Sequence, residues 1–218
     1  MTFKSDLFDL MDNLICVGSY PLFWVVKNKN IIISNGKIGS STLRNSCDYS
    51  CYDNKITSKG LLYMINNQGF RVDFVIREPR SRFRTGILED WFVSINYDFE
   101  SYDIEMSDVT NFVLRRLEDT VYSVPRSQYH IGNWLDDVVT LTEYLPKGSY
   151  RIWDLSDFTQ LLNELTITQT FKYSNSEKPQ VCNRFLELYD NLPNSVTEKV
   201  EEYLEEEVIK YHYLSTLK

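Results

Sequence analysis

The chain contains no alanine among its 218 residues and only 8 glycines. Small residues let backbones approach each other, or a phosphate group, closely. Their scarcity disfavours the glycine-rich phosphate-binding turns of Rossmann and P-loop proteins. Larger residues take their places, and the abundance of Asn, Ile, Lys, Tyr and Phe is typical of AT-rich genomes such as those of phages and viruses.

Apolar residues make up 43% of the chain and charged residues 25%, with a mean hydropathy of -0.34. This composition excludes collagen-like, low-complexity and wholly disordered chains. Lys and Arg number 23 against 31 Asp and Glu, a net charge of -8. Because such a protein repels phosphates on average, the charge disfavours nucleic acid as a partner.

Cysteine usage and targeting signals point to a reducing, intracellular setting, in the host cytoplasm or a virion. The four cysteines form no C-x-x-C pair and stand at Cys16, Cys47, Cys51 and Cys182. The two histidines, His130 and His212, do not fall at zinc-motif spacings, so we expect no metal and no cofactor. We find no signal peptide, and the apolar runs are too short to span a bilayer, so we expect no membrane contact.

The first half of the chain reads as a helix followed by strands. A helix is predicted over residues 7–15, behind Ser5. Residues 22–26 and 31–34 predict short strands, followed by an Asn35-Gly36 turn, and residues 37–58 predict a long polar loop or arm. Further strands are predicted at 61–65 and 70–77. Strict alternation predicts another over 88–99, with one buried face.

The second half is richer in helices. Ser107 is predicted to cap a helix that ends before Pro125. Residues 138–145 and 150–155 predict a hairpin, although a helix beginning at Trp134 is an alternative. Ser156 is predicted to cap a short helix, followed by a possible strand over 167–173 and a linker over 174–179. Two amphipathic helices follow, the second with a Ser195 and Glu198 capping box.

Together these patterns predict an α+β fold. A predominantly antiparallel sheet occupies the first two thirds and is flanked by helices, with a helical C-terminal segment. We expect an α+β domain over residues 1–173 and a helical C-terminal appendage over 174–218.

The most unusual local feature is a basic run in what is predicted to be a loop between two strands. Its candidate interaction residues are Arg77, Arg80, Arg82, Phe83 and Arg84. Guanidinium groups and an aromatic ring can grip phosphates or stack on a base, but they can equally pair with acidic protein surface. Because the chain is acidic, we favour protein contact, either with this chain or with a neighbouring copy.

An acidic run on the last predicted helix is the counterpart of the basic one. Its candidate interaction residues are Glu201, Glu202, Glu205 and Glu206. Such a run is usually a solvated helix face, but it can also dock on a basic groove, as an inhibitor of a nucleic-acid enzyme would. Tyr211 and Tyr213 form a candidate docking tail, with a packed terminus as the alternative.

Catalytic signatures are missing from the sequence, including the nucleophile elbow, the P-loop and the zinc-protease motif. The densest carboxylate cluster could suit Mg²⁺ or Ca²⁺ and consists of Asp98, Glu100, Asp103, Glu105 and Asp108. We favour a structural role, because an acid in the first turn of a helix is stabilised by the helix dipole.

The sequence therefore predicts a non-enzymatic protein–protein interaction and assembly component, such as a virion head–tail connector or tail protein. Its expected partners are copies of itself or other assembly subunits. An acidic inhibitor or immunity-type protein that binds a host or rival factor is the first alternative. A metal-assisted enzyme of unrecognised motif is the second.

Overall fold

The computed structural model describes residues 23–35, 42–43, 49–50, 58–95, 103–118, 134–167 and 180–218. Contacts divide the chain into two units, which we describe separately. Within the described ranges, the strand unit holds the sheet, helices that pack with it and residues 210–218. The described part of the helical unit consists of helices from the middle of the chain and from residues 180–209.

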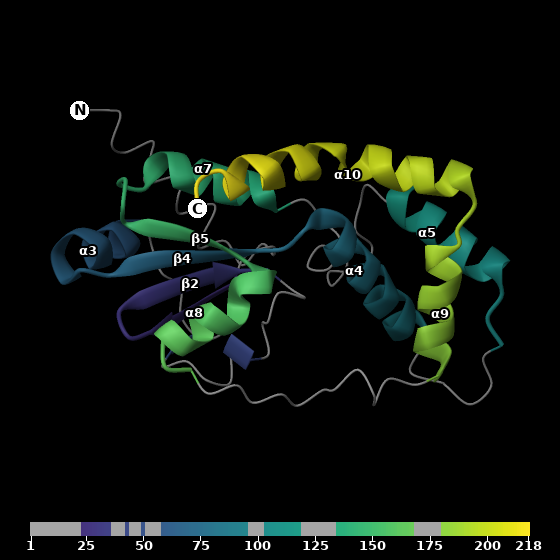
Figure 1. Cartoon of the computed structure of the whole chain (residues 1–218), viewed down its shortest axis with the longest axis horizontal. Coiled ribbons are helices and arrows are strands. Elements are labelled where there is room, and N and C mark those ends of the chain that lie inside the picture. Colours follow the sequence, from purple (N-terminus) through teal and green to yellow (C-terminus); the bar gives the residue numbers. More distant parts are fainter. Residues whose placement is uncertain are drawn as a thin grey trace. The chain divides into compact units, whose positions relative to one another are not determined.

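The strand unit is built on one mixed five-stranded sheet, in the order β3-β1-β2-β4-β5. Figure 1 labels β2, β4 and β5 of this sheet. The strands are β1 (Phe23–Lys27), β2 (Asn30–Ser34), β3 (Tyr49–Ser50), β4 (Arg71–Ile76) and β5 (Tyr150–Asp154). β1 is antiparallel to both β2 and β3, whereas β4 is parallel to both β2 and β5. The α+β character is confirmed, but the prediction of a predominantly antiparallel sheet is wrong.

β4 shows why the alternation rule misjudged the sheet. Val72, Phe74 and Ile76 share one face of this strand, yet Asp73 and Val75 on the other face are also fully buried. Parallel strands are typically covered on both faces, so a central one reads as a continuous apolar run. β4 is such a strand, because it lies between two parallel neighbours.

The turn that joins β1 to β2 consists of Asn28 and Lys29. The Asn35-Gly36 turn of the sequence prediction lies after β2 and is a different connection. Both turn residues have positive φ, +50° and +60°. Two positive φ values in a two-residue loop define a type I′ turn, whose twist matches that of the flanking strands. Asn35 is buried directly after β2.

The helices whose bounds the structure gives for the strand unit are α3 (Ser58–Gln68), α7 (Leu135–Tyr144) and α8 (Phe158–Glu164). The strand predicted at 61–65 is wrong, because it lies inside α3, which ends just before Gly69 at φ +69°. The strand predicted at 138–145 is also wrong, and the helical alternative beginning near Trp134 is confirmed as α7. The predicted strand at 150–155 is confirmed as β5.

The short helix expected behind Ser156 is confirmed, with a different cap. Asp154 accepts a hydrogen bond from the Ser156 N–H and begins the 3₁₀ turn η1 (Leu155–Asp157), which leads into α8. Residues of the sheet and of α7 and α8 share one apolar core, which Leu214 joins from the far end of the sequence. Residues 210–218 are thus part of this unit.

The helical unit contains α4 (Pro79–Ser94), α5 (Met106–Glu118), α9 (Gln180–Asp190) and α10 (Asn194–Ser215) as far as Ile209. The strand predicted over 88–99 is wrong, because residues 88–94 lie in α4. The buried apolar residues of this segment recur at helical spacing and are Phe83, Ile87, Leu88, Trp91 and Ile95. A period of 3.6, rather than 2, therefore describes the segment.

The predictions of the helices α5, α9 and α10 are confirmed. The predicted caps are wrong, because Ser107 lies inside α5, which begins at Met106, and Ser195 lies inside α10, which begins at Asn194. Trp91 of α4 packs on Phe185 of α9, with ring centroids 4.8 Å apart. Cys182 is a buried, reduced thiol in the same core. α4, α5, α9 and α10 thus enclose a second apolar core, separate from that of the strand unit.

Several predictions fall outside the described residues. These are the helix over 7–15, most of the loop over 37–58, residues 96–99 of the wrong strand, all but the first residue of the strand predicted over 167–173, and the linker over 174–179. β3 and residues 42–43 are the described parts of the loop. The grouping of α9 and most of α10 with α4 and α5 differs from the separate appendage predicted for 174–218. Among the described helices, none has the length and apolar character needed to cross a membrane.

Candidate functional site

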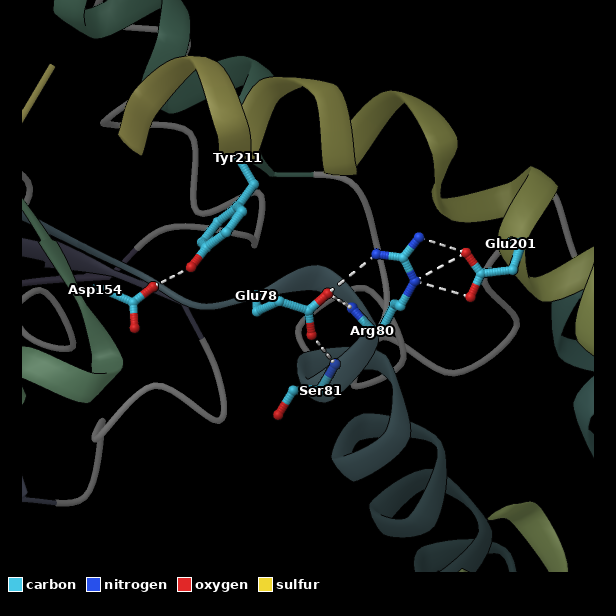
Figure 2. Close-up of polar contacts among 6 residues, drawn as sticks. All are labelled: Glu78, Arg80, Ser81, Asp154, Glu201 and Tyr211. Carbon is cyan, nitrogen blue, oxygen red and sulfur yellow. Dashed lines mark hydrogen bonds and ion pairs between the residues drawn. The ribbon is translucent and has the colours of Figure 1, made fainter. Parts of the chain in front are cut away.

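The basic run begins a helix and is not the loop between strands that the sequence predicted. Pro79 occupies the first turn of α4, where its missing N–H costs nothing. Glu78 caps the helix, because its carboxylate accepts hydrogen bonds from the Arg80 N–H at 3.1 Å and the Ser81 N–H at 2.7 Å (Figure 2). The arginines that follow are therefore held on a rigid helical turn.

Arg80 makes a forked ion pair with Glu201 of α10, as Figure 2 shows. Its Nε and Nη2 atoms lie 2.8 Å and 2.6 Å from Oε2 of Glu201, and Nε also lies 2.9 Å from Oε1. The hydrogen bonds to Glu201 raise the pKa of the Arg80 guanidinium above its ordinary value. One candidate of the basic run is thus paired with one of the acidic run.

Arg84, one turn further along α4, forks onto Asp190 at the end of α9. Its Nε lies 2.7 Å from Oδ1 and its Nη2 lies 2.5 Å from Oδ2. The hydrogen bonds raise the pKa of Arg84 and hold the pKa of Asp190 below its ordinary value. The guanidinium and the carboxylate neutralise each other within the helical unit.

Arg82 and Phe83 point into the core of the helical unit and are fully buried. Nη2 of Arg82 lies 3.5 Å from Oε2 of Glu207, which is also fully buried. The Phe83 ring packs on Tyr203 with centroids 5.7 Å apart. Arg77 is half-buried just before α4 and has contacts of its own. The five candidates of the basic run therefore do not form one accessible cationic patch.

The carboxylates of α10 fall into two sets. Glu201 and Glu207 pair with arginines of α4, whereas the other acidic side chains of this segment are exposed. We call the exposed set the acidic face, and it consists of Glu198, Glu202, Glu205 and Glu206. Glu198, Glu202 and Glu205 form no ion pair with another described residue.

The net charge of the chain is concentrated in the helical unit. Its described residues carry fifteen acidic and seven basic side chains, a net charge of -8. That value equals the net charge of the entire chain, so all other residues together balance to zero. The acidic face therefore lies in the part of the protein with the strongest negative field.

A shallow groove of about 300 Å³ separates α5 from α10 in the helical unit. Its apolar lining is Leu114 and Leu117 of α5 and Tyr203 of α10. All three are only partly buried and pack on the edge of the helical core. Charged side chains also line the groove, and these are Glu118, Lys199 and Glu202. Glu202 belongs both to the groove and to the acidic face.

A larger hollow of about 440 Å³ lies beside the two forked ion pairs of the helical unit. Its lining combines these pairs with apolar side chains and includes Arg80, Glu201, Arg84, Asp190, Leu192 and Val200. Burial raises the pKa of Tyr189, which also lines it. Because two guanidiniums face two carboxylates here, the charged groups of this hollow are already satisfied by each other.

The two tyrosines of the candidate docking tail have different surroundings in the strand unit. The hydroxyl of Tyr211 donates a short hydrogen bond to Asp154 at the end of β5 (Figure 2). Burial opposes ionisation of Asp154, but hydrogen bonds from Tyr211 and Ser156 outweigh it and lower its pKa. Tyr213 is 45% exposed, so it stays available for contact, whereas Tyr211 holds the chain to its own sheet.

Sequence reasoning missed a polar network on the sheet. The fully buried Asp73 of β4 accepts hydrogen bonds through Oδ1 from Arg151 Nε at 2.7 Å and Trp153 Nε1 at 2.9 Å. Arg151 also reaches Glu164 at 2.7 Å and lies over the Trp153 ring. Burial opposes the charge of Arg151, but the two carboxylates outweigh it and raise its pKa. The available signal was a lone Asp within an apolar strand.

The carboxylate cluster is only partly described, because Asp98 and Glu100 lie outside the described residues. Asp103, Glu105 and Asp108 are exposed, and Asp108 Oδ2 accepts a hydrogen bond from the Glu105 N–H at 3.0 Å. This contact is one half of a capping box at the start of α5. Within the described ranges, no group of three or more His, Cys, Asp or Glu side chains could hold a metal ion.

Comparison with known proteins found no match: no protein-family model, no curated protein and no solved structure is similar to this chain. The functional argument therefore rests on the residues themselves.

Proposed function

We propose that the protein works by binding other proteins rather than by catalysis, as an interaction and assembly component that docks through its acidic face. One observation carries the proposal: the net charge of -8 resides in the helical unit, where the carboxylates of the acidic face are exposed. A surface of one charge favours a partner of the opposite charge and accelerates its association.

The basic run is not part of this docking surface. Arg80, Arg82 and Arg84 are paired with carboxylates of the same unit, so a partner would have to displace those carboxylates to reach them. Within the part of the chain that the structure describes, Glu198, Glu202 and Glu205 of the acidic face have no ion-pair partner that a protein would have to displace. The expected partner therefore presents Lys and Arg side chains.

The proposal has two narrower forms, which differ in stoichiometry. An assembly subunit, such as a virion head–tail connector or tail protein, joins many copies into a closed or extended structure. An acidic inhibitor or immunity-type protein instead forms a small complex with one basic target. The AT-rich residue usage supports the first form, and the helix-borne acidic face supports the second. The native mass, measured alone and with the partner, separates the two.

Zero-length carbodiimide cross-linking tests the proposal, because this reagent joins a carboxylate directly to a lysine of a bound partner. The full chain is cross-linked in extracts of its source cells, and the joined peptides are identified by mass spectrometry. We expect partner lysines attached to Glu198, Glu202, Glu205 or Glu206. We also expect both the cross-links and the co-purifying protein to be lost in Glu202→Gln/Glu205→Gln.

The matched control is Asp103→Asn/Glu143→Gln, which removes two exposed carboxylates outside the acidic face and changes the net charge equally. It should retain the partner. Equal loss of the partner in both variants would indicate that binding depends on the overall charge of the protein and not on the acidic face. Cross-links that map outside α10, and persist in the Glu202 and Glu205 variant, would contradict the proposal.

A further inference from the structure

The groove between α5 and α10 adjoins the acidic face and differs from it in chemistry. Leu114, Leu117 and Tyr203 line it with apolar surface that the helical core covers only in part. A cavity of about 300 Å³ can receive one or two large apolar side chains. Protein interfaces typically gain most of their affinity from a few such side chains seated in pockets, inside a polar rim.

We infer that this groove receives an apolar side chain from a basic segment of the partner protein, with Lys or Arg residues on either side of that anchor. The inference rests on the proposed function, because it specifies the partner of the same surface. Charge complementarity carries it: Glu118 and Glu202 line the groove, and Glu202 continues into the acidic face.

One residue of the groove opposes a basic partner. Among the described residues that line the groove, Lys199 is the one cation, and it is exposed. It forms no ion pair with another described residue, so its charge is open to an approaching segment. Replacing it with an acid should therefore strengthen binding, a gain that loss of stability cannot imitate.

Two synthetic peptides of equal charge test the inference. Both are short, fluorescein-labelled and rich in lysine, and one carries leucine on a single helical face where its twin carries glutamine. Leucine and glutamine have similar helix propensities, so the peptides differ in apolar anchoring and not in helicity. Binding to the full chain is followed by fluorescence anisotropy at several salt concentrations.

We expect the lysine–leucine peptide to bind about 10-fold more tightly than its glutamine twin or better, since burying one leucine gives roughly that gain. Binding of both peptides should weaken as salt rises. Lys199→Glu should tighten binding of both by about 2- to 5-fold, in the range expected for exposed charge pairs. Lys147→Glu, which makes the same charge change at an exposed turn of the strand unit, should have a smaller effect.

A polar substitution in the groove supplies the converse result. Leu117→Asn should remove the preference for leucine while leaving binding of the glutamine twin unchanged. The twin thereby reports that the variant is still folded and still presents its acidic face. Loss of binding of both peptides in this variant would instead indicate damage to the helical unit. The test then depends on Lys199→Glu, which should tighten binding if the inference is correct.

The outcomes separate the inference from the proposed function. If both peptides bind equally and both weaken in Glu202→Gln/Glu205→Gln, docking at the acidic face stands and the groove inference is overturned. If neither peptide binds, docking at the acidic face fails, and the groove inference with it. If the lysine–leucine peptide binds more tightly and Lys199→Glu strengthens it, the inference is supported. A doubled native mass that the peptide does not reduce would make a second copy of the chain the occupant, and would overturn the inference.

Discussion

Arg82 of α4 and Glu207 of α10 form an ion pair in which neither side chain has any exposed surface, with Nη2 and Oε2 3.5 Å apart. The cost of removing both charges from water largely offsets their attraction, so the intact pair adds little stability. The loss of either partner removes the opposite charge at 3.5 Å from a group that stays buried. We therefore expect Glu207→Gln to lower the free energy of unfolding by about 3–5 kcal/mol, measured by urea denaturation.

Two further variants test this reasoning. The double variant Arg82→Met/Glu207→Leu should regain most of the loss, because it removes both charges of the buried pair. Arg80→Gln breaks the exposed fork to Glu201 and should cost less than about 1 kcal/mol, since water already screens that pair. Equal losses of unfolding free energy in Glu207→Gln and Arg80→Gln would contradict the distinction between the buried and the exposed ion pair.

The hydrogen bond from Tyr211 to Asp154 predicts a particular dependence of stability on pH. The pKa of Asp154 is lowered below its ordinary value of 3.8 in the folded state. A carboxyl group of this kind stabilises the fold fully above its unfolded pKa, and that contribution is lost as the pH falls through the folded pKa. Asp154→Asn should therefore be less stable than the wild type by a constant amount between about pH 5 and 8.

The difference in stability should shrink as the pH falls below 3.8. Protons then bind to the carboxyl group of the unfolded wild-type chain first, and to that of the folded protein only at lower pH, so the advantage of the charged group is lost. Thermal unfolding of both proteins across this range measures it. Tyr211→Phe should show the same pattern to a smaller extent, since Ser156 still donates to Asp154. A difference that grows toward low pH would be inconsistent with a lowered pKa.

The β1–β2 turn predicts a stabilising substitution. Lys29 has φ +60°, a left-handed conformation that glycine adopts without the steric cost of a Cβ atom. Asn-Gly is the preferred pair in a type I′ turn. Lys29→Gly should therefore raise the free energy of unfolding by about 0.5–1 kcal/mol, measured by urea denaturation. Lys27→Gly, within β1, should lower it, and a loss of stability in both variants would refute the turn assignment.

The capping box of α5 predicts that Asp108 has a structural and not a metal-binding role. Asp108→Ala should lower stability by about 1 kcal/mol, because the Glu105 N–H loses its acceptor. Asp103→Ala, at an exposed acid of the same cluster, should change it by less than about 0.5 kcal/mol. A rise in melting temperature on adding Mg²⁺, seen in the wild type and lost in Asp108→Ala, would favour the metal-assisted enzyme instead.

Local patterns predicted elements correctly where a single periodicity was present. α5, α9 and α10 each carry one apolar stripe, and each has buried residues along it. In α4 two periods coincide: Trp91, Val93 and Ile95 alternate like a strand, yet Ile87, Trp91 and Ile95 also recur at helical spacing. The deciding signal lay upstream, because Glu78-Pro79 is a strong helix start.

The pairing of the basic run could not be predicted by any local rule. Arg80, Arg82 and Arg84 meet carboxylates 121, 125 and 106 residues away along the chain. The sequence indicated that the arginines would meet acidic protein surface, but not which surface. Only the packing of α4, α9 and α10 into one core brings those charges together.

The parallel pairing of β4 was missed for a similar reason. Strand direction depends on where the connections run, and the residues of a strand report only how deeply it is buried. α3 precedes β4, and the connection from β4 to β5 includes α4, α5 and α7, which gives the chain room to return in the same direction. The one feature of β4 itself that indicates parallel neighbours is that side chains on both of its faces are buried.

Leu214 is fully buried in the core of the strand unit, and Tyr211 and Leu217 pack against the same core. The strands of that unit lie between residues 23 and 154, so its hydrophobic core is assembled from segments synthesised far apart in time. A nascent chain can pair β1 with β2 early, but it cannot close this core until translation has passed Leu217. Until then the strand unit exposes apolar surface, and chaperone occupancy on the ribosome should persist beyond the completion of β5.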